Sequence, residues 1–82
     1  MITAEEIVNL IQQEIPDAKV EMTDLAGGDH WSAVVVSDAF AGKSRVEQHK
    51  MVYKPLKDQM ANQSIHALQL KTLTPDQAGA SS

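Results

Sequence analysis

Three histidines are the side chains in this 82-residue sequence best suited to binding a metal through nitrogen: His30, His49 and His66. Cysteine is absent, which excludes disulfides, thiolate zinc sites and thiol catalysis. The sequence also has no Ser-His-Asp spacing, no phosphate-binding glycine loop and no histidine pair at i, i+4. A binding role is therefore favoured over an enzyme, and any metal must be met by His, Asp, Glu or a partner's groups.

Each histidine has a structural explanation beside the functional one. His30 lies in a polar turn next to Asp29, where an exposed histidine is usually incidental. His49 falls within an apolar helical stripe, where a packed core residue is more common than a ligand. His66 opens a strand on the face that it shares with two leucines, and a polar ring there needs a backbone partner or a metal.

The hydrophobic periodicity predicts the elements that position these side chains. Thr3 and Glu6, and later Ser44 and Glu47, have the spacing of helix capping boxes, and Pro55 should bend the second helix. The apolar stripe of that helix is Val46, His49, Tyr53, Leu56 and Met60. The expected elements are a helix over residues 3–14, strands over 18–25 and 31–37, a helix from 44 to about 60, and a strand over 65–71.

This order, α-β-β-α-(α)-β, predicts one small α+β domain over residues 1–75, with a three-stranded mixed sheet covered by helices on one face. Residues 76–82 are small and polar, so we expect a flexible, frayed tail. The crossover through the second helix makes strands two and three parallel. Both then begin at one sheet edge, where the rings of His30 and His66 could converge, whereas His49 lies roughly 18 Å back along its helix.

The charge distribution is less uniform than the net charge of -4 and the pI near 5.1 suggest. That balance opposes unspecific attraction to nucleic acid or anionic lipid. No signal-peptide pattern or membrane-spanning apolar run is present, so we expect a soluble cytoplasmic protein. Five of the seven basic residues form either a partner-binding face or an ordinary solvated surface: Lys43, Arg45, Lys50, Lys54 and Lys57.

Several motifs in joint spacing resemble the BolA family, from the first helix to Pro75. They are the run Phe40-Ala41-Gly42-Lys43-Ser44-Arg45-Val46, then His49, Val52-Tyr53 and Leu56, then Ile65-His66-Ala67-Leu68 and Thr74-Pro75. The resemblance implies a fold similar to class II KH domains. It also implies association with a monothiol glutaredoxin that carries a glutathione-ligated 2Fe-2S cluster, in iron–sulfur trafficking or iron sensing.

The family's ligand positions, in the loop between the first two strands and at the opening of the last strand, match His30 and His66, with His49 a weaker candidate. Because the loop carries His instead of Cys, the chain resembles the histidine-loop type. The resemblance implies a cluster shared with glutaredoxin and glutathione, since this chain has no thiol to hold one alone.

The rival hypothesis is a nucleic-acid-binding regulator, because some BolA relatives act in transcription. KH domains grip the nucleic-acid backbone with a GXXG loop, and residues 39–44 offer only Gly42. Whether the free protein forms a homodimer is left open by the sequence.

Overall fold

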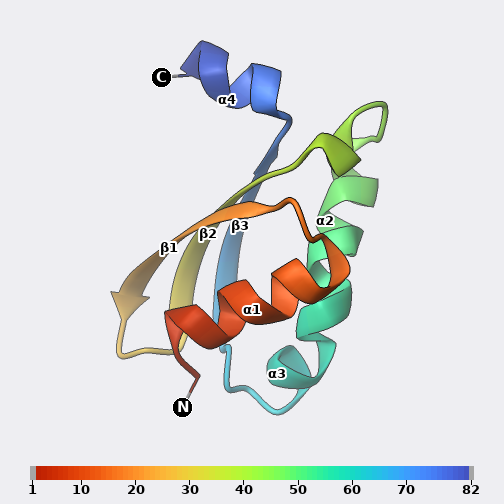
Figure 1. Cartoon of the computed structure of the whole chain (residues 1–82). Helices are drawn as coiled ribbons and strands as arrows, with labels where there is room; N and C mark the ends of the chain where they lie inside the picture. The colour runs from red at the N-terminus through yellow and green to blue at the C-terminus, as the bar shows by residue number, and fades with distance from the viewer. Residues whose placement is uncertain (1, 82) are drawn as a thin grey trace.

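A mixed sheet of three strands carries the fold in the computed structural model, which describes residues 2–81 (Figure 1). The strands β1 (Lys19–Ala26), β2 (His30–Val36) and β3 (Ala67–Leu73) lie in the order β1-β2-β3. β1 runs antiparallel to β2, and β2 runs parallel to β3. The predicted α+β class and the parallel pairing of the last two strands are therefore confirmed, although β3 begins two residues later than expected.

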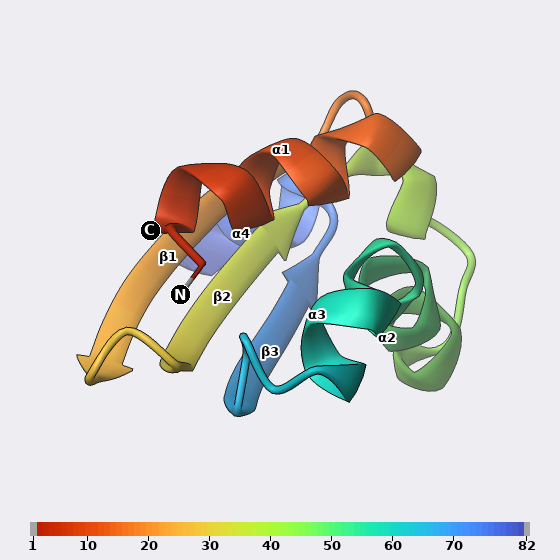
Figure 2. The same ribbon diagram turned by 90° about the horizontal axis from the view of Figure 1, so that it is seen from below.

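Helix α1 (Ala4–Glu14) begins where the sequence indicated. The Thr3 hydroxyl accepts a hydrogen bond from the Glu6 backbone N–H, which satisfies one of the free donors at the helix start. Ile7 and Ile11 are fully buried on the face that packs against the sheet. Figure 2 shows α1 lying across β1 and β2, so one apolar helix face covers one face of the sheet.

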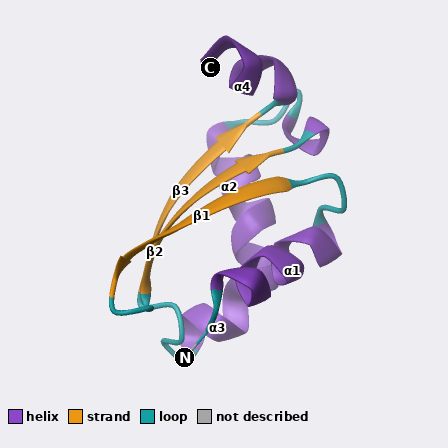
Figure 3. Ribbon diagram, turned by 60° about the vertical axis from the view of Figure 1, so that its left-hand side comes forward, coloured by secondary structure: helices purple, strands orange, loops and turns teal. Residues whose placement is uncertain are grey.

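The connection from β2 to β3 bends at the predicted proline. After the 3₁₀ turn η1 (Asp38–Phe40), helix α2 (Arg45–Tyr53) leads into η2 (Lys54–Leu56) and α3 (Lys57–Ala61). Pro55 lies in η2, where its missing N–H removes a helical hydrogen bond. In Figure 3, α1, α2 and α3 lie on the same side of the sheet.

The core-facing side of α2 differs from the predicted stripe. Val46 is 64% exposed, and His49 and Tyr53 are only partly buried, so the prediction for these three residues was wrong. Gln48 and Val52 face inward instead. The polar Gln48 can do so because its side-chain amide hydrogen-bonds to the Phe40 carbonyl and to Thr72. Buried apolar residues of the core are Ile2, Ile7, Ile11, Ile15, Ala18, Trp31, Ala33, Val35, Phe40, Val52, Leu56 and Ile65.

The C-terminal segment contains a helix that was not expected, α4 (Pro75–Ser81), and the flexibility expected of this tail stays a prediction. Thr74 and Gln77 explain its start, because the Thr74 N–H donates to Gln77 Oε1 and the Gln77 N–H donates to Thr74 Oγ1. Proline suits the first helical position, since its missing N–H would have no partner there. No helix within residues 2–81 is long and apolar enough to cross a membrane.

An exposed carboxylate links the end of the first helix region to the end of β2. Asp17 accepts hydrogen bonds from the Ser37 hydroxyl at 2.6 Å and from the Asp38 N–H at 2.9 Å. These two bonds, led by the one from Ser37, lower the pKa of Asp17 because they favour its charged form. The bonds position the chain where it leaves the sheet toward η1.

Candidate functional site: a histidine pair at the sheet edge

Two histidine rings meet where β2 and β3 begin. His30 is the first residue of β2 and is in parallel register with Ala67, the first residue of β3. His66 immediately precedes that strand, and the ring centroids of His30 and His66 lie 5.0 Å apart with a tilt of 52°. The predicted convergence of these two rings is confirmed.

Asp29 holds both histidines in place. Its backbone carbonyl accepts hydrogen bonds from the N–H of His66 at 2.8 Å and of Ala67 at 3.1 Å. Its carboxylate oxygen Oδ1 lies 2.7 Å from Nδ1 of His30. When Nδ1 carries the proton of this bond, Nε2 of His30 is left with the lone pair that a metal ligand needs.

The turn before His30 is braced on both sides. Gly27 and Gly28 adopt φ angles of 68° and 79°, which glycine tolerates without a steric penalty. The Gly28 N–H donates to Asp24 Oδ1, and its carbonyl accepts from the indole N–H of the buried Trp31. The register also shifts between Asp24 and Ala26, as in a β-bulge. Together these contacts hold the turn in one conformation, which sets the position of His30 beside His66.

The donor set fits a shared metal centre. Imidazole nitrogens bind a tetrahedral ion at about 2.0–2.1 Å, which puts the centroids of two coordinated rings about 5 Å apart. The His30 side chain is 42% exposed and His66 is also exposed, so a partner can reach both. No cluster of three or more His, Asp or Glu ligands occurs within residues 2–81. The pair could supply two ligands to a metal ion, and a tetrahedral ion would need its other ligands from outside the described residues.

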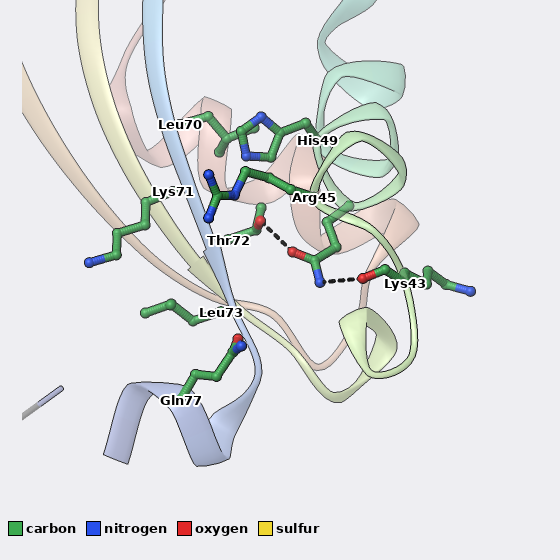
Figure 4. Close-up of a pocket in the computed structure, with 9 residues that line it drawn as sticks. Lys43, Arg45, His49, Leu70, Lys71, Thr72, Leu73 and Gln77 are labelled. Atoms are coloured by element: carbon green, nitrogen blue, oxygen red, sulfur yellow. Dashed lines mark hydrogen bonds between the residues drawn. The ribbon is translucent and has the colours of Figure 1, made fainter. Parts of the chain in front are cut away.

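His49 lies apart from this pair. It lines a groove with the second half of β3 (Figure 4). Its ring makes an edge-to-face contact with the ring of Tyr53, at 6.3 Å between centroids. The prediction that His49 lies away from the shared edge is confirmed. The expectation that it is a core residue was wrong, because Gln48 takes the inward position beside it.

The five basic residues singled out from the sequence fall on two surfaces. Lys43 and Arg45 line the groove beside β3, where sequence reasoning missed a third cation, Lys71. Its signal was the alternation of β3, which places Lys71 on the opposite face of the strand from its neighbours Leu70 and Thr72. Lys50, Lys54 and Lys57 surround a second hollow together with Tyr53 and Met60.

The start of α2 beside the groove carries a fully formed capping box. The Glu47 N–H donates to Ser44 Oγ, and the Ser44 N–H donates to the Glu47 carboxylate. The hydrogen bond from the Ser44 backbone N–H, followed by one from the Ser44 side chain, lowers the pKa of Glu47 because both favour the charged carboxylate. The carboxylate is therefore occupied at the helix terminus.

Comparisons with known proteins agree with this architecture. The family model described as BolA-like protein matches residues 6–77. The chain is 34% identical over 74 residues to protein RP812 of Rickettsia prowazekii (strain Madrid E), covering 89% of this chain and 95% of that protein. It also resembles the structure of a bolA protein homologue from Coxiella burnetii, with a TM-score of 0.81 and 34% identity over 96% of this chain and 99% of the other.

A further structural match is the BolA domain of SufE1 from Arabidopsis thaliana. Its TM-score is 0.77 at 28% identity, and the match covers 93% of this chain and 98% of that domain. The comparisons give no support to the expected similarity to class II KH domains, which stays a prediction.

Proposed function

This chain belongs to the BolA-like protein family, and from that premise we propose that it is a non-enzymatic adaptor for a monothiol glutaredoxin. In the proposed complex, His30 and His66 contribute ligands to a glutathione-ligated 2Fe-2S cluster that the two proteins share. The complex would serve iron–sulfur trafficking or iron and redox sensing. We place it in the cytoplasm, where thiols are kept reduced.

The paired rings are the observation that supports this proposal. An imidazole pair on one iron is an established alternative to thiolates and raises the reduction potential of a 2Fe-2S cluster. This chain has no cysteine, so a glutaredoxin cysteine and glutathione would hold the other iron. The hydrogen bonds to Asp29 keep both rings at the end of the sheet where β2 and β3 begin, and a partner can approach them there.

The basic residues of α2 to α3 suit docking of the partner. Lys50, Lys54 and Lys57 are clustered around one hollow, and Lys43 and Arg45 lie at the start of α2. Complementary charge speeds encounter with an acidic protein surface and with the carboxylates of glutathione. This electrostatic contribution should weaken as salt is raised.

A spectroscopic titration tests the proposal. The purified chain is added to a cluster-loaded monothiol glutaredoxin with glutathione, and visible absorption and circular dichroism are recorded. We expect a changed spectrum and a one-to-one complex. His66→Ala should abolish the change, His30→Ala should weaken or shift it, and the matched control His49→Ala should leave it intact.

Two results would contradict the proposal. One is a stoichiometric 2Fe-2S spectrum from the isolated chain after anaerobic reconstitution with iron and sulfide. The other is loss of the mixed-complex spectrum in His49→Ala but not in His66→Ala, which would show that the ligand assignment is wrong.

A further inference from the structure

A groove of about 660 Å³ separates α2 from the open edge of β3 (Figure 4). Four consecutive strand residues, Leu70 to Leu73, line it. Because successive side chains of a strand point to opposite faces, four in a row can line one hollow only where it follows the strand's main chain. β3 is an edge strand, and within residues 2–81 no strand pairs with its outer side. The groove therefore follows a sheet edge that can accept another strand.

Cations surround this edge. Lys43 and Arg45 approach it from the start of α2, and Lys71 lies on the strand itself. None of the lining residues is Asp or Glu, and the nearby Glu47 carboxylate is bound in its capping box. Figure 4 shows the Arg45 guanidinium pointing toward β3, whereas the ammonium groups of Lys43 and Lys71 extend away from the groove on either side. A segment that enters the groove therefore meets Arg45 directly and lies between the two lysines, although the whole chain is acidic.

The two walls are fixed relative to each other. Thr72 Oγ1 donates to Gln48 Oε1 at 2.7 Å, and Gln48 Nε2 donates to the carbonyls of Phe40 and Lys43, each at 3.0 Å. Gln48 thus ties α2 to β3 and to the loop that precedes the helix. Because these bonds hold the groove open before a ligand arrives, less conformational entropy is lost on binding.

We propose that this groove binds an extended acidic peptide segment of a partner protein, which adds as a further strand to the edge of β3. Main-chain hydrogen bonds to the edge would supply affinity, and Arg45 in the groove, with Lys43 and Lys71 on either side of it, would select acidic side chains. His49 and Arg45 line the groove and can stack on bases. A nucleic-acid strand still fits less well, because its backbone cannot continue the hydrogen-bond ladder of a sheet.

This inference is independent of the proposed cluster function. Leu70 follows Ala67, at the histidine end of β3, by about 10 Å along the strand. Peptide binding is therefore tested on the chain without iron, sulfide or glutaredoxin. Failure of the peptide test leaves the spectroscopic test untouched, and the reverse also holds.

The experiment uses a fluorescent peptide of about eight residues in which Glu and Val alternate, so that each type occupies one face of a strand. Binding is measured by fluorescence anisotropy and by amide hydrogen exchange of the full chain. We expect saturable binding that weakens with salt, and increased protection of amides within Leu70 to Leu73. A peptide with Lys in place of Glu should not bind.

Two double variants of equal charge change test the site. Lys43→Glu with Arg45→Glu should weaken binding at least about tenfold, because both residues line the groove and the Arg45 guanidinium points toward β3. Lys54→Glu with Lys57→Glu changes the net charge equally but lies at the second hollow, so it should weaken binding less than about threefold. Equal weakening by the two double variants would overturn the assignment to this groove.

Two further probes can overturn the proposal. N-methylation of alternate peptide amides removes strand pairing and leaves the charge unchanged, so undiminished binding of that peptide would rule out strand addition. Oligothymidylate of similar charge should bind more weakly than the Glu-Val peptide. If it binds more tightly and displaces the peptide, the groove is a nucleic-acid site instead.

Discussion

Asp29→Ala should separate metal binding from stability at the histidine pair. The substitution removes the carboxylate beside His30 and keeps the backbone carbonyl that anchors His66. The His30 and Asp29 side chains are 42% and 45% exposed, so their pairing should contribute only about 0.2–1 kcal/mol to folding. Loss of a carboxylate that orients a ligating histidine typically costs about 10–100-fold in metal affinity.

The assay compares two measurements on the same variant. Urea unfolding gives the change in the free energy of unfolding, and a titration of cluster-loaded glutaredoxin followed by circular dichroism gives the affinity of the mixed complex. Glu21→Ala is the matched control, since it removes an exposed carboxylate from β1, away from the rings. We expect Asp29→Ala to weaken the complex about 10–100-fold while the control leaves it unchanged.

A specific result would refute this reasoning. If Asp29→Ala binds the cluster complex as tightly as the unmodified chain, while His30→Ala and His66→Ala do not, the carboxylate plays no part in orienting the ligand. The 2.7 Å contact would then be a surface ion pair with no effect on the ligand.

Three other substitutions test separate parts of the structure. Gln48→Ala should lower the free energy of unfolding by about 2–4 kcal/mol in urea titrations, because it removes interior hydrogen bonds and leaves their partner groups unpaired. A change below about 1 kcal/mol would contradict the bridging role of Gln48. His49→Ala should lower the free energy of unfolding by less than about 1 kcal/mol in the same assay, because the His49 ring is partly exposed. A larger loss would indicate that His49 packs as a core residue. The folded-state pKa of Asp17 is lowered below its unfolded value, so its stabilisation is present above the unfolded pKa and is lost as pH falls through the folded pKa. Asp17→Asn should therefore flatten the acid side of a plot of Tm against pH, and an unchanged acid slope would show that its hydrogen bonds do not stabilise the fold.

The sequence was sufficient for the elements whose signals are local. The capping residues Thr3 and Ser44 marked helix starts, and Pro55 marked the bend. The meeting of His30 and His66 followed from topology alone, because a crossover makes the two strands parallel and brings their first residues to one edge.

The errors arose where a polar residue has a tertiary partner. Gln48 faces inward because Thr72 and two carbonyls satisfy its amide, and no helical periodicity of apolar residues contains that information. The start of α4 did have a local signal, the Thr74–Gln77 spacing around a proline. It was overlooked because no apolar stripe follows it.

The turn that precedes His30 is held by a residue that can also serve as an optical reporter. Trp31 is the chain's single tryptophan, and its buried indole donates to the turn that carries His30. A 2Fe-2S cluster absorbs light at the wavelengths that tryptophan emits, so a cluster held by the neighbouring histidine should quench this emission by energy transfer. The unlabelled protein can thus report the arrival and departure of a cluster in a stopped-flow fluorimeter, which gives the rates of transfer between partners.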